Sequence, residues 1–365
     1  MAVNEDVEAK RLGERLLVDV QVEGLSEVLS SLRALGVGSE SNYFPTANTP
    51  FNIPELDTLL PPSRSTILEL VSPSPSHHPS GAGKTSLLYL LIAQAILPPT
   101  HPSIPFLNGH SGAVILLDPL HHFSVPRLAS VILNLLISKL PSSATPLDAS
   151  TKASLLSTTA TSLDHVHIFH PSSWASLVST LQSLPGYLFS GTRHKSTQRR
   201  IHSLILDDAD AFTWPLRAAH ADKASSARST ASSPLAAASR QLTAQIKSLT
   251  AQLACHAILA SSSLAPSSFR PPLPTAWPAG LDVTRLAVRR VEVVRFAPEM
   301  SVEQAEREKG QRGEVVRRGR FEAWKVGGTA TATGLGHGLG RGQEAAERFV
   351  FRVGERGVEM ERGAG

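Results

Sequence analysis

The sequence predicts an α/β fold with a mostly parallel sheet, a helical extension at the N-terminus and a β-rich tail at the C-terminus. Between residues 51 and 260, short apolar runs of strand length alternate with longer apolar runs of helical spacing. This alternation is typical of parallel strands joined by crossover helices. A glycine-rich loop at residues 81–85 follows one predicted strand and precedes a predicted helix. From residue 286 on, the pattern changes to strands that alternate polar and apolar residues.

The individual elements follow from hydrophobic periodicity and from the turn residues between them. Strands are predicted over residues 66–71, 113–117, 166–169, 201–206 and 255–260, and later over residues 286–296, 320–326 and 348–353. Helices are predicted within residues 5–35 and over residues 53–60, 87–97, 125–140, 174–184 and 235–253. Two polar segments without a periodic face are predicted to be disordered insertions near residues 141–162 and 218–233.

These elements divide the chain into an extension, a core and a tail. Residues 1–38 form the N-terminal helical segment and residues 39–50 a linker. Residues 51–300 form the α/β core. Residues 301–365 form the C-terminal β tail, which contains a glycine-rich linker over residues 327–342.

The composition excludes several classes of protein. Of the 365 residues 41% are hydrophobic, so the chain has enough apolar surface to bury a core. The single cysteine, Cys255, excludes an intrachain disulfide and a cysteine-based zinc site, which is typical of a reducing compartment. The longest apolar run, residues 87–97, is too short to span a bilayer. The net charge is +4, and the basic surplus is densest over residues 193–200, which fits either phosphate contacts or a solvated loop.

The sharpest functional signal is a phosphate-binding loop. Its residues are Ser80, Gly81, Ala82, Gly83, Lys84, Thr85 and Ser86. Glycines let backbone N–H groups turn toward a phosphate, and the helix that follows adds its N-terminal dipole. In this pattern Lys84 reaches the β- and γ-phosphates of ATP, and the Thr85 hydroxyl holds Mg²⁺. The full pattern has a glycine where this chain has His78, so an ordinary glycine-rich turn is the alternative.

The second part of such a site is a strand that ends in a carboxylate. Asp207 follows an apolar strand and would contact Mg²⁺ through a water molecule. Asp118 follows the preceding strand, where we expect it to close the strand. A hydrolase needs a general base near this point, but Leu120 stands two residues after Asp118 and offers no oxygen.

The histidine pairs His77-His78 and His121-His122 raise the question of a metal site. Adjacent side chains point in different directions and do not chelate one ion well. We therefore interpret them as loop histidines, and Cys255 as an inert core thiol.

Together these landmarks resemble the RecA-like recombinases of eukaryotic DNA repair, most closely the paralogues of the X-ray-repair cross-complementing group-two type in fungal form. The segments that carry the resemblance are residues 53–60, 81–85, 114–128, 204–214 and 349–353. They include Leu56-Asp57 before the first core strand, His122-Phe123 and Arg127-Leu128 after the second, and Asp207 with Trp214 at the magnesium strand. The phosphate loop alone occurs in many folds, so the specificity comes from the combination.

The resemblance implies a RecA-like P-loop NTPase core that binds ATP and Mg²⁺ and acts in homologous recombination and double-strand-break repair in the nucleus. Active members of the family polymerise on single-stranded DNA, and paralogues form small hetero-complexes that support the filament. His78, Leu120 and the hydroxyls of residues 261–263, where the family has an amide sensor, depart from the active pattern. The departures indicate an accessory paralogue with at most a weak DNA-linked ATPase.

The expected partners are another RecA-like recombinase paralogue, the recombinase filament and single-stranded or branched DNA; a membrane is not among them. Candidate DNA contacts are Lys223, Arg228 and Arg270. Three cations give little phosphate neutralisation, so the chain alone should bind DNA weakly. The tighter contact is expected through an apolar stripe in the N-terminal helical segment, which alternatively packs on the chain's own core. The stripe consists of Leu12, Leu16, Leu17 and Leu25.

Two other functions remain open from the sequence. A P-loop kinase for a small molecule would use the basic loop over residues 193–200 as a lid, but no acceptor carboxylate stands out. A scaffold with a decayed nucleotide site is the other alternative, favoured by His78 and Leu120.

Overall fold

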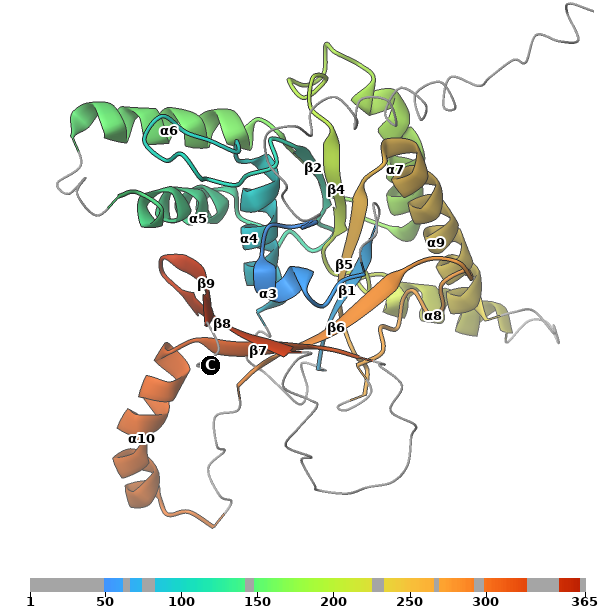
Figure 1. The fold of residues 1–365 in the computed structure, drawn as a ribbon. Helices are drawn as coiled ribbons and strands as arrows, with labels where there is room; N and C mark the ends of the chain where they lie inside the picture. Colours follow the sequence, from blue (N-terminus) through green and yellow to red (C-terminus); the bar gives the residue numbers. More distant parts are fainter. Residues whose placement is uncertain are drawn as a thin grey trace, which may run out of the picture. The chain divides into compact units, whose positions relative to one another are not determined.

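A nine-stranded mixed sheet organises the described part of the chain (Figure 1). The computed structural model describes residues 49–61, 66–73, 83–141, 148–224, 233–265, 269–291, 299–326 and 348–361, with backbone only for residues 220–224. The predicted N-terminal helical segment, nearly all of the linker over residues 39–50 and the glycine-rich linker over residues 327–342 lie outside these ranges. The described residues belong to one compact unit.

The strands of the sheet are mostly parallel. Their order across the sheet is β3-β2-β4-β5-β1-β6-β7-β8-β9. The strands that pair in parallel are β1 (Ile67–Ser72), β2 (Ala113–Leu117), β3 (Val166–Phe169), β4 (Ile201–Leu206), β5 (His256–Ser262) and β6 (Val283–Arg290). The strands that continue the sheet in antiparallel pairs are β7 (Arg320–Lys325), β8 (Arg348–Gly354) and β9 (Gly357–Glu361). The predicted α/β fold with a mostly parallel sheet is confirmed, and the tail strands extend the same sheet.

Helices cover both faces of the parallel part (Figure 1). The helices are α3 (Pro54–Asp57), α4 (Lys84–Ile96), α5 (Val125–Ser138), α6 (Ala149–Leu163), α7 (Trp174–Leu188), α8 (Thr213–Ala224), α9 (Pro234–Leu253) and α10 (Val302–Arg317). One core packs α4 and α5 against the sheet, and a second core packs α7 and α9 against the other face. Successive strand residues point to opposite faces, so Val114 and Leu116 enter the first core while Ile115 and Leu117 enter the second.

Helix α4 is apolar on all sides because it is enclosed on all sides. Residues 87–96 of the helix are buried. The helix contacts β1 and β2, α5 and the last strand, β9. A helix without a polar face is expected only where every face packs on protein. The N-terminus of α4, at Lys84, is thereby held between the sheet and the tail strands.

The prediction of a disordered insertion near residues 141–162 is wrong for residues 149–162, because helix α6 occupies residues 149–163. Asp148 caps its N-terminus by accepting a hydrogen bond from the N–H of Thr151. Leu155, Thr159 and Ser162 are buried at helical spacing. The Thr159 hydroxyl donates to the Leu155 carbonyl at 2.9 Å, so a polar side chain is buried with its hydrogen bond satisfied. Composition alone misled the prediction, because small polar residues pack here as core residues.

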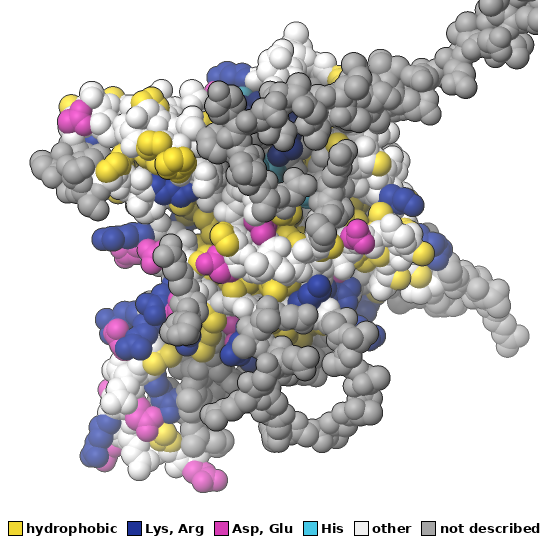
Figure 2. Space-filling model, in the orientation of Figure 1, with side chains coloured by type: hydrophobic (Ala, Val, Ile, Leu, Met, Phe, Trp, Pro, Cys, Tyr) yellow, Lys and Arg dark blue, Asp and Glu magenta, His cyan; other side chains and the backbone are white. Residues whose placement is uncertain are grey.

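Two further predictions need correction. In the predicted insertion over residues 218–233, α8 continues to Ala224, consistent with the high helix propensity of its alanines. In the predicted β tail, α10 forms with a capping box between Ser301 and Gln304 and no buried residue. Its charged side chains of both signs alternate over its surface (Figure 2). The sequence analysis missed α10 because a helix that is polar all round shows no apolar periodicity.

No helix in the described ranges has the length and apolar character needed to cross a bilayer.

Candidate functional site

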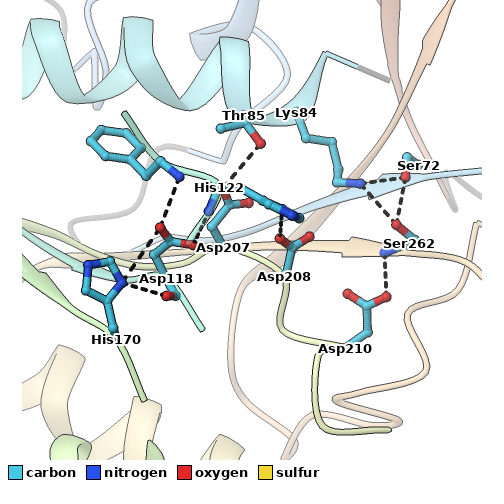
Figure 3. Close-up of polar contacts among 11 residues, drawn as sticks. Ser72, Lys84, Thr85, Asp118, His122, His170, Asp207, Asp208, Asp210 and Ser262 are labelled. Atoms are coloured by element: carbon cyan, nitrogen blue, oxygen red, sulfur yellow. Dashed lines mark hydrogen bonds and ion pairs between the residues drawn. The ribbon is translucent and has the colours of Figure 1, made fainter. Parts of the chain in front are cut away.

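The candidate site lies where the carboxyl ends of β1, β4 and β5 meet, beside the N-terminus of α4 (Figure 3). In a parallel sheet these ends share one edge, so loops far apart in the sequence come together. Ser72 ends β1 and stands opposite Ser262 of β5 in the sheet register. Lys84, the first residue of α4, extends toward this pair.

The Lys84 ammonium is held by hydroxyl groups. Its Nζ donates to Ser72 Oγ at 2.6 Å and to Ser262 Oγ at 3.2 Å. Burial lowers the pKa of Lys84, and the carboxylates that follow β4 oppose that shift. Among the described residues, the hydrogen-bond acceptors of this cation are thus neutral hydroxyl groups. An incoming anion would make a stronger, charge-assisted bond.

Thr85 and Asp207 are in contact, although 122 positions separate them in the sequence. The Thr85 hydroxyl donates to Asp207 Oδ2 at 3.2 Å. Asp207 is fully buried, and its other oxygen, Oδ1, has no hydrogen-bond partner among the residues that the structure describes. Burial, together with the charge of Asp208, raises the pKa of Asp207 to about 7.

This pair fits a hard cation such as Mg²⁺. A buried carboxylate oxygen without a partner costs about 1–3 kcal/mol, and a cation or a water molecule in its shell would satisfy it. Hydroxyl and carboxylate oxygens are the ligand types that Mg²⁺ prefers. The residues that the sequence predicted for the magnesium site, Thr85 and Asp207, are therefore brought together.

Asp118 closes β2, as predicted. It is fully buried, and its carboxylate accepts the backbone N–H groups of His122 and Phe123, both at 3.0 Å. These bonds fold residues 118–123 into a tight loop. His170 approaches from the next strand, and its Nδ1 lies 2.9 Å from the Asp118 carbonyl oxygen.

The adjacent histidines of this loop contact different partners. His121 has a φ of 56° and stacks on His170, with ring centroids 4.1 Å apart. His122 turns instead toward the loop after β4, where its Nδ1 lies 2.9 Å from Asp208 Oδ2 (Figure 3). This divergence agrees with the interpretation of the pair as loop histidines.

Leu120 offers the site no polar group, as its identity predicts. Its side chain is 46% exposed in the loop after β2. Among the hydroxyls of residues 261–263, Ser262 contacts Lys84 and Ser263 Oγ donates to the Ala265 carbonyl.

The sequence analysis missed Ser72, Asp208 and Asp210 as site residues. Asp210 Oδ2 accepts the Ser262 N–H at 3.2 Å, and its Oδ1 is buried without a partner. A signal was present in the run Asp207-Asp208-Ala209-Asp210, whose carboxylates follow a buried strand. Nothing in the sequence, in contrast, pairs Ser72 with Ser262, because sheet register decides that pairing.

Several predicted site residues cannot be placed in this geometry. Ser80, Gly81 and Ala82 lie outside the described residues, whereas Gly83 and Ser86 flank the contacts made by Lys84 and Thr85. Of the candidate DNA contacts, Arg228 also lies outside, Lys223 is described only by its backbone, and Arg270 is exposed. The apolar stripe of Leu12, Leu16, Leu17 and Leu25 lies outside as well.

No protein-family model matches the chain, and no curated protein matches its sequence. The geometry of the site and the residues that form it are therefore the basis for inferring a function.

Proposed function

We propose that the chain binds Mg²⁺–ATP at the carboxyl ends of β1, β4 and β5. The observation that carries this proposal is the contact of Thr85 with Asp207, which leaves a buried carboxylate oxygen without a partner beside the N-terminus of α4. The sequence around it supplies a lysine at the start of the same helix and glycines before it. The end of β1, the start of α4 at Gly83 and the end of β4 thus converge on one point.

Each residue has a distinct task in this proposal. Lys84 exchanges its serine hydroxyl partners for oxygens of the β- and γ-phosphates. Thr85 and Asp207 hold Mg²⁺, the latter through a water molecule, and Mg²⁺ supplies positive charge next to the phosphates. Backbone N–H groups from Gly83 to Ser86 at the start of α4 face the same anion.

In the cell, we propose that the chain is an ATP-binding accessory factor in homologous recombination and double-strand-break repair, within a complex of RecA-like recombinase paralogues in the nucleus. The resemblance described above supports this. The parallel core with an antiparallel extension and the site at β1, β4 and β5 are compatible with a RecA-like P-loop core. Leu120, which offers no oxygen where active recombinases carry a catalytic carboxylate, favours an accessory role over strand exchange.

Nucleotide binding can be tested directly. We expect the purified protein to bind a fluorescent ATP analogue in the presence of Mg²⁺ and Lys84→Ala to lose binding, because each charge-assisted hydrogen bond contributes about 1.5–3 kcal/mol. Lys139→Ala is a matched control, since Lys139 is also part-buried and donates to a carbonyl oxygen, that of Leu107. Equal binding by wild type and Lys84→Ala would show that the site is wrongly assigned.

The scaffold alternative is favoured by Leu120 and by the hydroxyl partners of Lys84, which satisfy that cation without a nucleotide. Binding of the analogue separates the two functions, because a decayed site binds neither nucleotide nor Mg²⁺. Affinity purification from cells then tests the assignment to recombination. Recovery of a RecA-like partner supports it, and its consistent absence contradicts it.

A further inference from the structure

The hydrogen bond between His122 and Asp208 joins two loops of the candidate site. His122 lies in the loop after β2, and Asp208 follows β4, its neighbour in the sheet. The bond length is 2.9 Å; the His122 side chain is 58% exposed and that of Asp208 is 16% exposed. Asp208 is the residue next to Asp207, and its charge influences the pKa values of both Asp207 and Lys84. The imidazole is therefore anchored at the site but remains open to solvent.

The loop that carries His122 is fixed at both ends. The buried Asp118 carboxylate holds the His122 N–H at its start, and Tyr89 of α4 accepts the Ser124 N–H at 2.8 Å at its end. His121 and Asp208 each have a φ of 56°, which is unfavourable for residues with a side chain. Such backbone strain persists where surrounding contacts impose it, and it is concentrated at functional sites.

The bond to Asp208 determines which ring nitrogen of His122 is free. Because a carboxylate oxygen is the acceptor in this contact, the geometry assigns the hydrogen to Nδ1 of His122 as the donor. In a neutral imidazole the other nitrogen, Nε2, then holds a lone pair. A carboxylate that orients a histidine, which in turn presents a lone pair, is a general-base arrangement.

We propose that His122, oriented by Asp208, is the general base for slow ATP hydrolysis at this site, in place of the carboxylate that Leu120 does not provide. This inference rests on the proposed nucleotide site. Nε2 of His122 takes a proton from a water molecule while the water oxygen bonds to the γ-phosphorus. The bond from that phosphorus to the bridging oxygen breaks, and its electron pair leaves with ADP. The proton on Nε2 then passes to solvent, so the products are ADP and inorganic phosphate.

His122→Ala and Asp208→Asn test the two members of the pair. In single-turnover reactions with ATP and Mg²⁺, we expect His122→Ala to slow hydrolysis about 10²-fold or to background, because a positioned base typically contributes 10²–10⁴-fold. Asp208→Asn should also slow it, since an amide no longer fixes the Nδ1–H form. Binding of the fluorescent ATP analogue should change little in His122→Ala. His121→Asn is the matched control, because His121 is the adjacent histidine, stacks on His170 and tolerates asparagine at positive φ.

A measurement without nucleotide tests the geometry. Nitrogen-15 NMR of the nucleotide-free protein, with the His122 signals assigned by their loss in His122→Ala, should show Nδ1 protonated and Nε2 with its lone pair. Asp208→Asn should shift that balance. In the His122→Ala background, Leu120→Glu should restore hydrolysis by supplying a carboxylate in the same loop.

The outcomes separate this inference from the proposed function. Wild type that binds no ATP analogue contradicts the proposed function, and the inference with it. Wild type that binds ATP but hydrolyses it no faster than His122→Ala contradicts the inference alone. Protonated Nε2 with unprotonated Nδ1 in the neutral wild-type ring also overturns the inference.

Discussion

Gly83 meets two requirements that only glycine satisfies. It caps α4 in the left-handed region, with a φ of 85°. A Cβ at this position would lie 2.8 Å from Cδ1 of Phe321, which belongs to β7. Phe321 is buried and stacks on Phe351, so the ring has little freedom to move away. The start of α4 and the tail strands are therefore packed directly against each other.

We expect Gly83→Ala to destabilise the protein by about 1–3 kcal/mol, because it combines a strained φ with overpacking. The thermal midpoint and the affinity for the ATP analogue should both fall. Gly313→Ala is the control, since Gly313 lies in α10 and has open space around it. That change should stabilise by about 0.5–1 kcal/mol, as expected for Gly to Ala inside a helix. A thermal midpoint of Gly83→Ala equal to that of the wild type would contradict the close packing of Gly83 against Phe321.

At the other end of the strands, the buried His202 and the half-buried His110 and His256 hold the segment before α3 on the sheet. The His110 and His202 rings lie 4.6 Å apart, and the His202 and His256 rings 5.4 Å apart. Phe51 packs on His202 and His256, and His202 Nε2 lies 3.0 Å from the Pro50 carbonyl oxygen. Burial lowers the pKa values of His110 and His256 to about 4, and that of His202 well below its usual value. The nearby charge of Arg200 acts in the same direction.

These shifts predict a loss of stability in acid. Above pH 6.5 the histidines are neutral in folded and unfolded chains, and their contribution to stability is fully present. Between pH 6.5 and about 4, these histidines bind protons in the unfolded chain but stay neutral in the folded chain. The free energy of unfolding therefore falls by up to about 1.4 kcal/mol per pH unit for each histidine. Urea unfolding at a series of pH values measures this dependence.

His110→Phe keeps a ring in the cluster and removes one titrating group. Below pH 6.5, we expect it to reduce the slope of the free energy of unfolding against pH by about 1.4 kcal/mol per pH unit, which is the contribution of one proton. An unchanged slope in His110→Phe would show that His110 does not contribute to the acid sensitivity.

Assembly with a partner is the question for the complete chain. The apolar stripe of Leu12, Leu16, Leu17 and Leu25 is expected to contact a recombinase paralogue. Deleting residues 1–38 should therefore strongly reduce recovery of that partner in co-purification, while binding of the ATP analogue persists. Partner recovery equal to that of the full chain would contradict this interface.

DNA binding by the chain alone should be weak and only slightly dependent on salt, because the candidate contacts supply only three cations to neutralise phosphates. Fluorescence anisotropy with labelled single-stranded DNA at several salt concentrations measures both properties. Arg270→Ala should weaken binding by a small factor, since Arg270 is an exposed candidate contact. Tight binding by the isolated chain would contradict the accessory role.

The sequence by itself determined the features that depend on neighbouring residues. Strand periodicity placed the parallel strands β1 to β5, and helical periodicity predicted α4 from residue 87 on, although the helix begins at Lys84. An apolar strand that ends in Asp207 marked the second half of the site. In each case the pattern is formed by residues a few positions apart, which local propensity and periodicity describe.

Only the tertiary structure decided the contacts that join distant segments. Sheet register placed Ser262 against Ser72 and thus against Lys84. The pairing of β2 with β4 brought His122 to Asp208 across 86 positions. Helix α6 was missed because its Ser and Thr residues pack as core residues once neighbouring elements surround them. Helix α10 was missed because none of its residues is buried. These contacts depend on which strands become neighbours and which helix faces become covered. Neither can be predicted from residues that are close in the sequence.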